Sequence, residues 1–145
     1  MVYILDEGAE FDAPIERIWK YLMSETEHDH KRLKVVDAVT QGENVAIQTI
    51  DLYPGENMPA IRSKIKMTMY PPFGFVMEYV DGPMTGTKAF QFYIPKGNKT
   101  GVTVVGDFTA KDLDEDSVRR TALQFLEIAF NEDNENLRKL VAVTA

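Results

Sequence analysis

The stretch Phe11-Asp12-Ala13-Pro14-Ile15-Glu16-Arg17-Ile18-Trp19 joins an expected N-terminal strand, Val2–Asp12, to a short helix. Pro14 suits the first helical position, because the N–H group that proline lacks has no partner there. Glu16 adds a carboxylate to the first turn, where it favours the helix dipole. Apolar residues then recur at helical spacing as far as about Met23, at Ile15, Ile18, Trp19 and Leu22.

The middle of the chain predicts six further strands, because extended apolar runs there are separated by turn-forming residues. In Ile61–Tyr70, apolar and basic side chains alternate, so the two sets face opposite sides of the strand. Asp81-Gly82 is typical of a hairpin turn. Loops this short connect antiparallel neighbours, since a parallel crossover needs about a dozen residues. The expected strands are Leu33–Thr40, Val45–Leu52, Ile61–Tyr70, Phe75–Val80, Thr87–Ile94 and Val102–Ala110.

A long amphipathic helix is expected to close the chain. It begins within Asp112–Asp116, whose carboxylates suit an N-cap, and extends to Val143. Its roughly 28 residues span about 40 Å, whereas a nine-residue strand spans about 30 Å. The helix is therefore long enough to cover a whole sheet. Its apolar stripe comprises Val118, Ala122, Phe125, Leu126, Ala129, Phe130, Leu137, Leu140 and Val141.

Length and composition predict one domain, residues 1–145, of an ordinary globular protein. The chain has 145 residues, of which 44% are hydrophobic and 27% are charged. No apolar run reaches the roughly 18 to 20 residues that a membrane helix needs, so we expect no stable membrane insertion. The formal net charge of -7 argues against nucleic acid as a partner, because phosphate binding requires clustered Lys and Arg.

The absence of cysteine excludes disulfides, thiolate catalysis and cysteine-ligated zinc. The segment Met1–Asp6 lacks the basic and apolar regions of a secretory signal. We therefore expect an intracellular, cytoplasmic protein that needs no cofactor. Neither composition nor pattern predicts an oligomeric state.

The order of elements resembles the helix-grip superfamily, which includes START lipid-transfer domains, birch-pollen-allergen-like plant proteins and polyketide cyclase-like proteins (SRPBCC). The residues Phe11–Trp19 are similar to the family's pattern of a strand, an alanine, a glutamate and an aliphatic-Trp pair. The resemblance implies an α+β fold: a seven-stranded curved antiparallel sheet wrapped around the C-terminal helix, with a cavity for apolar molecules between them. The short turn Gln41–Asn44 departs from the plant proteins, whose corresponding loop is glycine-rich, and the subfamily is unassigned.

The face of the sheet toward the helix supplies most of the candidate ligand-binding residues. Five of the seven methionines fall between residues 58 and 84, and flexible thioethers suit a pocket that adapts to its ligand. The alternative is a filled core without a cavity. The candidates, which include groups that the last helix would contribute, are Ser63, Ile65, Met67, Met69, Met77, Tyr79, Phe90, Phe92, Phe125, Ala129 and Asp133, with Phe75 on the same predicted face.

Asp133 interrupts the apolar stripe of the last helix. A carboxylate on a buried face is unfavourable unless it is paired or solvated. Either the helix overhangs the sheet or kinks near Asn131–Asn134, or Asp133 reaches a wet cavity and orients a ligand. Sequence pattern alone favours the first interpretation, because Asn and Asp compete for backbone hydrogen bonds inside a helix.

Both histidines of the chain lie in Glu27-His28-Asp29-His30. If this segment is extended, His28 and His30 share a side and could bind a metal ion together with a nearby carboxylate; if it is helical, they diverge. Two histidines without an identified third ligand are weak evidence, so no metal site is assigned. Imidazole also titrates near neutrality, which suits acid–base catalysis.

Three functions remain open from the sequence. The first is binding or transport of a hydrophobic or amphipathic small molecule. The second is an enzyme of the cyclase, dehydratase or hydrolase type, in which His28, His30 or Asp133 acts as acid or base. The third is a protein–protein interaction module, which predicts a filled interior and a contiguous exposed apolar patch.

Overall fold

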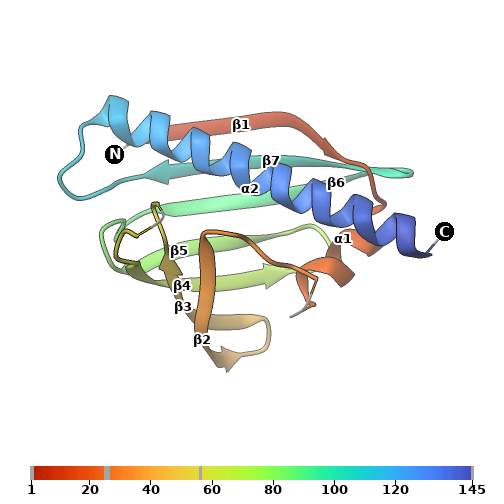
Figure 1. Ribbon diagram of the computed structural model, residues 1–145, viewed down its shortest axis with the longest axis horizontal. Helices are drawn as coiled ribbons and strands as arrows, with labels where there is room; N and C mark the ends of the chain where they lie inside the picture. Colours follow the sequence, from red (N-terminus) through yellow and green to blue (C-terminus); the bar gives the residue numbers. More distant parts are fainter. Residues whose placement is uncertain (1, 25–26, 56, 145) are drawn as a thin grey trace.

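The computed structural model describes residues 2–24, 27–55 and 57–144, and this part of the chain forms one sheet and two helices (Figure 1). A strand and a short helix come first, six strands follow, and a 30-residue helix comes last. None of the described helices is long and apolar enough to cross a membrane. The elements are β1 (Val2–Phe11), α1 (Ile15–Leu22), β2 (Leu33–Gly42), β3 (Val45–Leu52), β4 (Ile61–Tyr70), β5 (Gly74–Asp81), β6 (Lys88–Lys96), β7 (Lys99–Phe108) and α2 (Glu115–Thr144).

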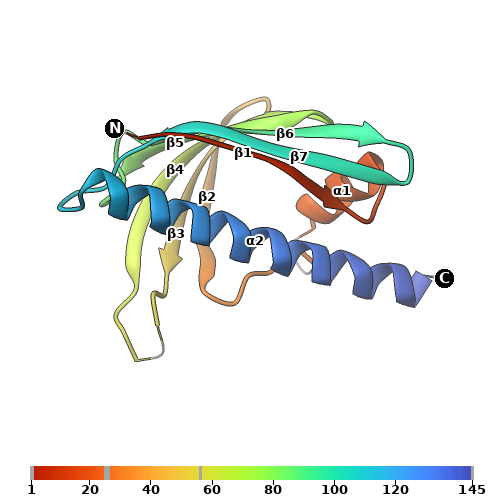
Figure 2. The same cartoon turned by 90° about the horizontal axis from the view of Figure 1, so that it is seen from above.

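The seven described strands pair antiparallel in the order β1-β7-β6-β5-β4-β3-β2. Short turns make consecutive strands from β2 to β7 neighbours, because each turn returns the chain beside the strand it has left. β1 pairs with β7, although nearly the whole sheet separates them in the sequence. Register shifts in β1, β2 and β5 bend the sheet. Figures 1 and 2 show β2, β3 and β4 turning toward the side on which α2 lies.

The core lies between α2 and the face of the sheet that α2 covers, which we call the inner face. α2 packs mainly against β1 and β7. Near its start, Val118 and Ala122 contact inner-face side chains of β6 and β7, such as Ala89 and Val104. Farther along, α2 reaches α1 through a second cluster. The buried members of that cluster are Phe11, Ala13, Ile15, Ile18, Trp19, Tyr21, Tyr93, Val102 and Leu137.

The structure confirms the order of elements and both helix starts with one adjustment. Pro14 is the N-cap of α1 and Ile15 its first residue, so proline lies one position earlier than expected. At the start of α2, the backbone N–H of Ser117 donates to the carboxylate of Asp114 at 2.7 Å, which is the predicted cap. α2 continues without a break through residue 133. The side chains of Leu140 and Val141, predicted on its stripe, lie outside the described part.

One strand begins earlier than the sequence predicts. Residues 96–101 have the composition of a loop, yet Lys96 pairs with Lys99 in the β6–β7 hairpin. Gly97 has a φ of 68°, a conformation that glycine adopts without steric strain and that closes a two-residue turn. β7 therefore starts at Lys99, and the prediction of Val102 was wrong by three residues.

Phe90 and Phe92 lie on the outer face, contrary to the prediction. Ala89 and Tyr93 are buried in the two inner clusters, and successive side chains of a strand point to opposite faces. The rings of Phe90 and Phe92 stack on one another at 6.1 Å, and Phe92 is 43% exposed. The error arose because β6 has apolar residues on both faces, so the sequence does not show which of its residues face α2.

The outer face carries a row of neighbouring apolar side chains. The register places Leu5 beside Val105 and Val105 beside Phe90. Leu5 and Val105 are 60% and 38% exposed. These three side chains form a short apolar row on the outer face, and the interaction module stays a prediction.

Candidate functional site

A small cavity lies under α2, against the inner face. Its volume is about 50 Å³, which accommodates only a few water molecules and is far below the roughly 300–1,000 Å³ of typical small-molecule pockets. The two core clusters pack beneath α2 beside this cavity. The lining residues are Asp6, Ala9, Phe11, Gln91, Val102, Val104, Leu126, Ala129, Phe130 and Asp133.

The predicted ligand-binding residues of β4 and β5 share the inner face. Met67 lies directly opposite Met77, and Met77 lies opposite the buried Ala89. Ser63 and Ile65 are buried, whereas the methionines and Tyr79 are only half-buried. Burial raises the pKa of Tyr79 to about 12, so its hydroxyl stays protonated. The half-buried inner-face side chains, which we call the methionine row, are Met67, Met69, Phe75, Met77 and Tyr79.

α2 contributes two predicted residues to the cavity wall. Ala129 and Asp133 line it, while Phe125 is 37% exposed and is not among the described residues that line it. The prediction of Phe125 as a ligand contact is therefore not supported, because its neighbour Leu126 is the residue that turns toward the sheet.

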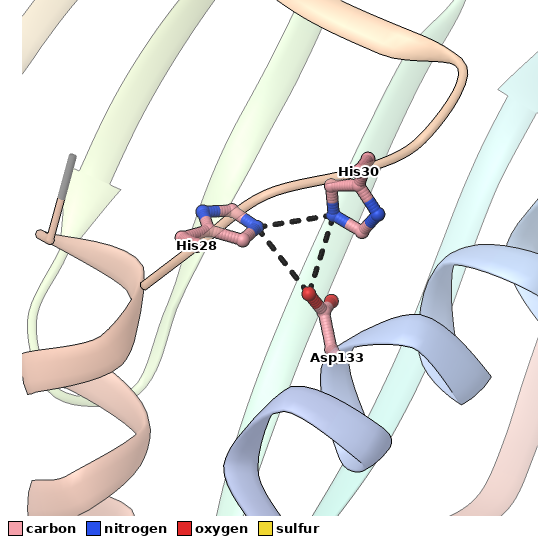
Figure 3. A group of neighbouring side chains, drawn as sticks. All are labelled: His28, His30 and Asp133. Atoms are coloured by element: carbon pink, nitrogen blue, oxygen red, sulfur yellow. Dashed lines mark hydrogen bonds and ion pairs between the residues drawn. The ribbon is translucent and has the colours of Figure 1, made fainter. Parts of the chain in front are cut away.

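Asp133 meets both histidines of the chain, which are more than a hundred residues away in the sequence (Figure 3). The Oδ1 atom of Asp133 lies 3.4 Å from Nε2 of His28 and 3.2 Å from Nε2 of His30. The two Nε2 atoms are 3.1 Å apart. We call these three residues the His-His-Asp cluster. Its carboxylate is buried and its imidazoles are partly exposed.

The chain after α1 brings the histidines to α2. Residues 28–30 are not helical, so His28 and His30 share a side, as the extended alternative predicts. Asn136 lies on α2 one turn beyond Asp133 and donates from Nδ2 to the carbonyl of Asp29 at 3.0 Å. This hydrogen bond holds the backbone between the two histidines against the helix.

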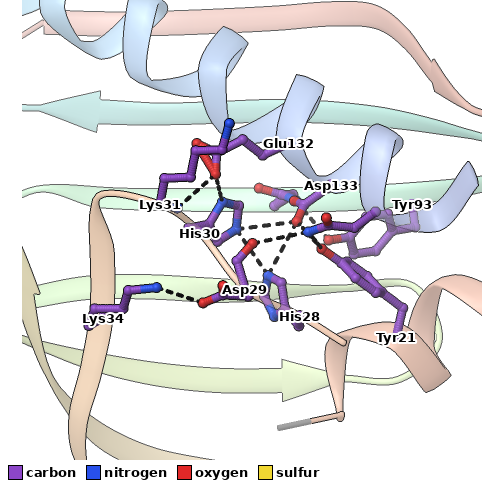
Figure 4. A network of polar contacts seen from close by, with 11 residues as sticks. Tyr21, His28, Asp29, His30, Lys31, Lys34, Tyr93, Glu132 and Asp133 are labelled. Carbon is purple, nitrogen blue, oxygen red and sulfur yellow. Dashed lines mark hydrogen bonds and ion pairs between the residues drawn. The ribbon is translucent and has the colours of Figure 1, made fainter. Parts of the chain in front are cut away.

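A surrounding layer of hydrogen bonds holds the cluster in place (Figure 4). The hydroxyl of Tyr21, which is buried on α1, donates to Oδ1 of Asp133 at 2.7 Å. Nδ1 of His30 lies 3.3 Å from a carboxylate oxygen of Glu132. The backbone N–H of Lys31 donates to the same oxygen at 3.0 Å. Both the carboxylate and one imidazole are thereby fixed in orientation.

Electrostatics keep Asp133 ionised although it is buried. Burial alone raises the pKa of this carboxyl, but hydrogen bonds from His28 and His30 outweigh burial and lower the pKa to about 2. Burial lowers the pKa of His30, but the neighbouring carboxylates of Asp133 and Glu132 raise it above its usual value overall. Burial raises the pKa of Tyr21, which remains a donor.

The sequence singled out each residue of this cluster but did not predict that the three residues are in contact. Asp133 stood out as a carboxylate on an apolar stripe, and the histidines stood out as a pair at i and i+2. Tyr21 and Glu132 were missed, because a tyrosine on a short amphipathic helix and a glutamate on a long one carry no distinguishing pattern. Asp133 lies in the wall of the cavity, and α2 has no kink near it; that Asp133 orients a ligand there stays a prediction.

Comparison with known proteins shows the fold through solved structures alone. No family model matches the chain, and no curated protein sequence matches it. A START superfamily protein from Mycobacterium smegmatis has 16% identity and a TM-score of 0.70, covering 95% of this chain and 98% of that one. The Zhui aromatase/cyclase from Streptomyces sp. R1128 has 10% identity and a TM-score of 0.62, covering 93% and 91%.

A third similar structure is the di-domain ARO/CYC protein StfQ from the steffimycin biosynthetic pathway. It has 12% identity and a TM-score of 0.73, and the match covers 97% of this chain but 51% of that one. The chain therefore has the α+β helix-grip fold of START and aromatase/cyclase proteins, with a curved seven-stranded antiparallel sheet and a long C-terminal helix. At these identities the likeness concerns the fold and assigns no subfamily.

Proposed function

We propose that the protein binds a hydrophobic or amphipathic small molecule against the inner face of its sheet. The methionine row carries this proposal, because it presents apolar side chains that are only half-buried on the face where α2 also lies. The helix-grip resemblance and the aromatase/cyclase neighbours support it. Removal of apolar surface from water stabilises such a complex by about 25 cal/mol per Å².

The row suits a flexible ligand contact better than a rigid one. Met67 and Met77 lie opposite each other on neighbouring strands, and unbranched thioethers adjust to differently shaped apolar partners. The cavity under α2 is too small to enclose a ligand, so the ligand lies along the row. A polar end of the ligand would then be oriented by Asp133 at the cavity wall or by the hydroxyl of Tyr79.

Paired substitutions on the two faces of the sheet test this proposal. The double variant Met67→Gln/Met77→Gln keeps side-chain volume on the inner face and replaces thioethers by amides. The control Thr68→Gln/Val76→Gln alters the neighbouring cross-strand pair, whose side chains lie on the outer face of the same two strands. We expect the affinity for a neutral naphthylamine dye to fall at least about tenfold in the inner-face variant, since about 1.4 kcal/mol corresponds to that factor.

The control variant is expected to bind the dye as the unmodified protein does. Equal affinity in all three proteins, or a loss confined to the outer-face variant, would overturn the proposal. Native mass spectrometry of the untreated protein adds a second measurement, because a copurifying small molecule should be retained by the control and lost from the inner-face variant.

A second candidate function is an enzyme that uses the same surface, and it is favoured by the convergence of polar groups on Asp133. An ionised carboxylate, an imidazole with a raised pKa and a protonated tyrosine within hydrogen-bond distance form an acid–base set. Turnover of model esters or of poly-β-ketone substrates, abolished by His30→Gln with dye affinity unchanged, would establish it. Absence of turnover on both substrate classes would leave the carrier function.

A further inference from the structure

We propose that the His-His-Asp cluster binds a divalent transition-metal ion through Nε2 of His28, Nε2 of His30 and Oδ1 of Asp133. This inference goes beyond apolar ligand binding and does not depend on it. Three observations carry it: the mutual distances of the three atoms, the hydrogen bonds that orient them, and the kinds of ligand that they provide.

The three atoms have the spacing of ligands on one face of a metal ion. Their separations are 3.1, 3.2 and 3.4 Å. Metal–nitrogen and metal–oxygen bonds of about 2.1 Å place neighbouring ligands about 3.0 Å apart in an octahedron and about 3.4 Å apart in a tetrahedron. An ion about 2.1 Å from all three atoms would lie about 1 Å outside their plane, so the three atoms already have the spacing that the ion requires.

The hydrogen bonds around the cluster leave Nε2 of His30 free to bind a metal ion. The carboxylate of Glu132 faces Nδ1 of His30, which favours the tautomer with the proton on Nδ1 and the lone pair of Nε2 directed at the cluster. Such a carboxylate–histidine pair is the usual support of a metal-binding imidazole. Tyr21 fixes Asp133, and Asn136 in turn donates to the hydroxyl of Tyr21 at 3.1 Å.

A cation also explains the convergence better than hydrogen bonds within the cluster do. One proton can bridge only two of the three atoms at a time, whereas one cation can accept a lone pair from all three once the Nε2 atoms are deprotonated. In the described part of the chain, the ion-pair partners of Asp133 are the two histidines, and no Lys or Arg pairs with it. A buried carboxylate is therefore compensated only if the imidazoles are protonated or a cation is bound.

The ligand types indicate the class of metal. Two imidazole nitrogens and one carboxylate oxygen suit Zn²⁺, Fe²⁺ or Co²⁺. Ca²⁺ and Mg²⁺ prefer sites built from oxygen ligands, and copper(I) prefers sulfur. Three protein ligands leave at least one coordination position for water or another molecule. The site would therefore hold an ion with room for an additional ligand.

Titration of tag-free, chelator-treated protein with Co²⁺ and Zn²⁺ tests the inference. We expect saturation at one ion per chain, visible absorption bands of bound Co²⁺, and loss of these bands when Zn²⁺ is added. Asp133→Asn and His28→Gln should each weaken Zn²⁺ binding by at least about a hundredfold, since loss of an outer hydrogen-bond partner alone commonly weakens binding 10–100-fold. Glu132→Gln should fall within that smaller range.

Asp29→Asn is the matched control, because it makes the same chemical change between the two histidines on a side chain that is 67% exposed and pairs with Lys34. It should bind metal normally. His28 is the more exposed histidine, at 29% of its side chain, so its variant should fold as judged by circular dichroism even if Asp133→Asn does not.

Failure to saturate at one ion, or equal weakening in Asp29→Asn and His28→Gln, would overturn the inference. Tight binding of Mg²⁺ or Ca²⁺ in preference to Zn²⁺ would overturn the assigned class of metal. Dye binding by the Met67→Gln/Met77→Gln pair is measured without metal, so failure of one proposal does not imply failure of the other.

Discussion

Removing the hydroxyl of Tyr21 measures how much its hydrogen bond to the ionised Asp133 contributes to the free energy of unfolding. Tyr21 is 1% exposed, its hydroxyl donates to Asp133 at 2.7 Å, and it accepts from Asn136 at 3.1 Å. Tyr21→Phe removes both hydrogen bonds and keeps the ring. A hydrogen bond to a charged group contributes about 1.5–3 kcal/mol and a neutral one about 1 kcal/mol, so we expect destabilisation of about 3 kcal/mol.

Tyr93→Phe is the matched control. Tyr93 is equally buried, at 2% exposure, but its hydroxyl accepts one hydrogen bond, from the neutral amide of Gln91 at 2.7 Å. Its loss should reduce the free energy of unfolding by about 1 kcal/mol. The difference between the variants, about 2 kcal/mol, corresponds to about 1 M in urea midpoint for a slope near 2 kcal/mol/M.

The assay is urea unfolding of metal-free protein, followed by circular dichroism and by fluorescence of Trp19, the single tryptophan. Coincident transitions would justify two-state values. Repeating Tyr21→Phe in the Asp133→Asn background completes a double-mutant cycle, in which a coupling of about 1–2 kcal/mol is expected. The reasoning is refuted if the two Tyr→Phe variants differ by less than about 0.5 kcal/mol or if the coupling vanishes.

Two further predictions concern pH and close packing. The pKa of Asp133 is about 2 in the folded protein against 3.8 ordinarily. The ionised carboxylate therefore stabilises the fold above about pH 4, and this stabilisation is lost as the pH falls toward 2. Between about pH 5 and pH 2.5, the free energy of unfolding should fall by about 2 kcal/mol more in the unmodified protein than in Asp133→Asn. A Cβ on Gly106 would lie 2.7 Å from the carbonyl oxygen of Lys88 and 2.9 Å from Cα of Ala89, whereas one on Gly42 would meet nothing within 4 Å. Gly106→Ala should therefore raise the unfolding rate and cost about 1–3 kcal/mol, while Gly42→Ala should change stability by less than about 1 kcal/mol; similar values for the two glycines would contradict the packing of β6 on β7.

The order of elements could be predicted from the sequence because each decision was local. Pro14 and Asp114 mark helix starts through caps that involve only neighbouring residues. Strand parity could be assigned in β4, where basic side chains mark the outer face. In β6 it could not, since Phe90 and Phe92 are apolar on the outer face and Ala89 and Tyr93 fill the inner face. Alternation gives parity only when one face is polar.

The size of the space under α2 depends on side-chain volumes that no pattern encodes. The resemblance implied a ligand cavity, whereas the cavity under α2 has a volume of about 50 Å³ and is too small to enclose a ligand. Two core clusters lie beside it, one around Val118 and Ala122 and the other around Leu137. Whether apolar residues on facing elements interdigitate or stand apart depends on the bend of the sheet, to which register shifts in β1, β2 and β5 contribute.

The His-His-Asp cluster required a contact between two segments that the sequence separates by about a hundred residues. Asp133 on the helix and the histidine pair after α1 each had two interpretations, and neither segment alone contained the information to choose between them. The segment after α1 is held extended by Asn136 on α2, and Asp133 is compensated by the histidines of that segment. The anomaly on the helix and the anomaly in the loop therefore have one physical cause: a buried carboxylate needs positive charge or a cation, and the histidines can provide or hold it. Asn136→Leu removes the hydrogen bond to the backbone of Asp29 and leaves all three proposed metal ligands in place. It should therefore weaken metal binding. If the hydrogen bonds within the cluster alone held the histidines in place, Asn136→Leu would leave metal binding unchanged.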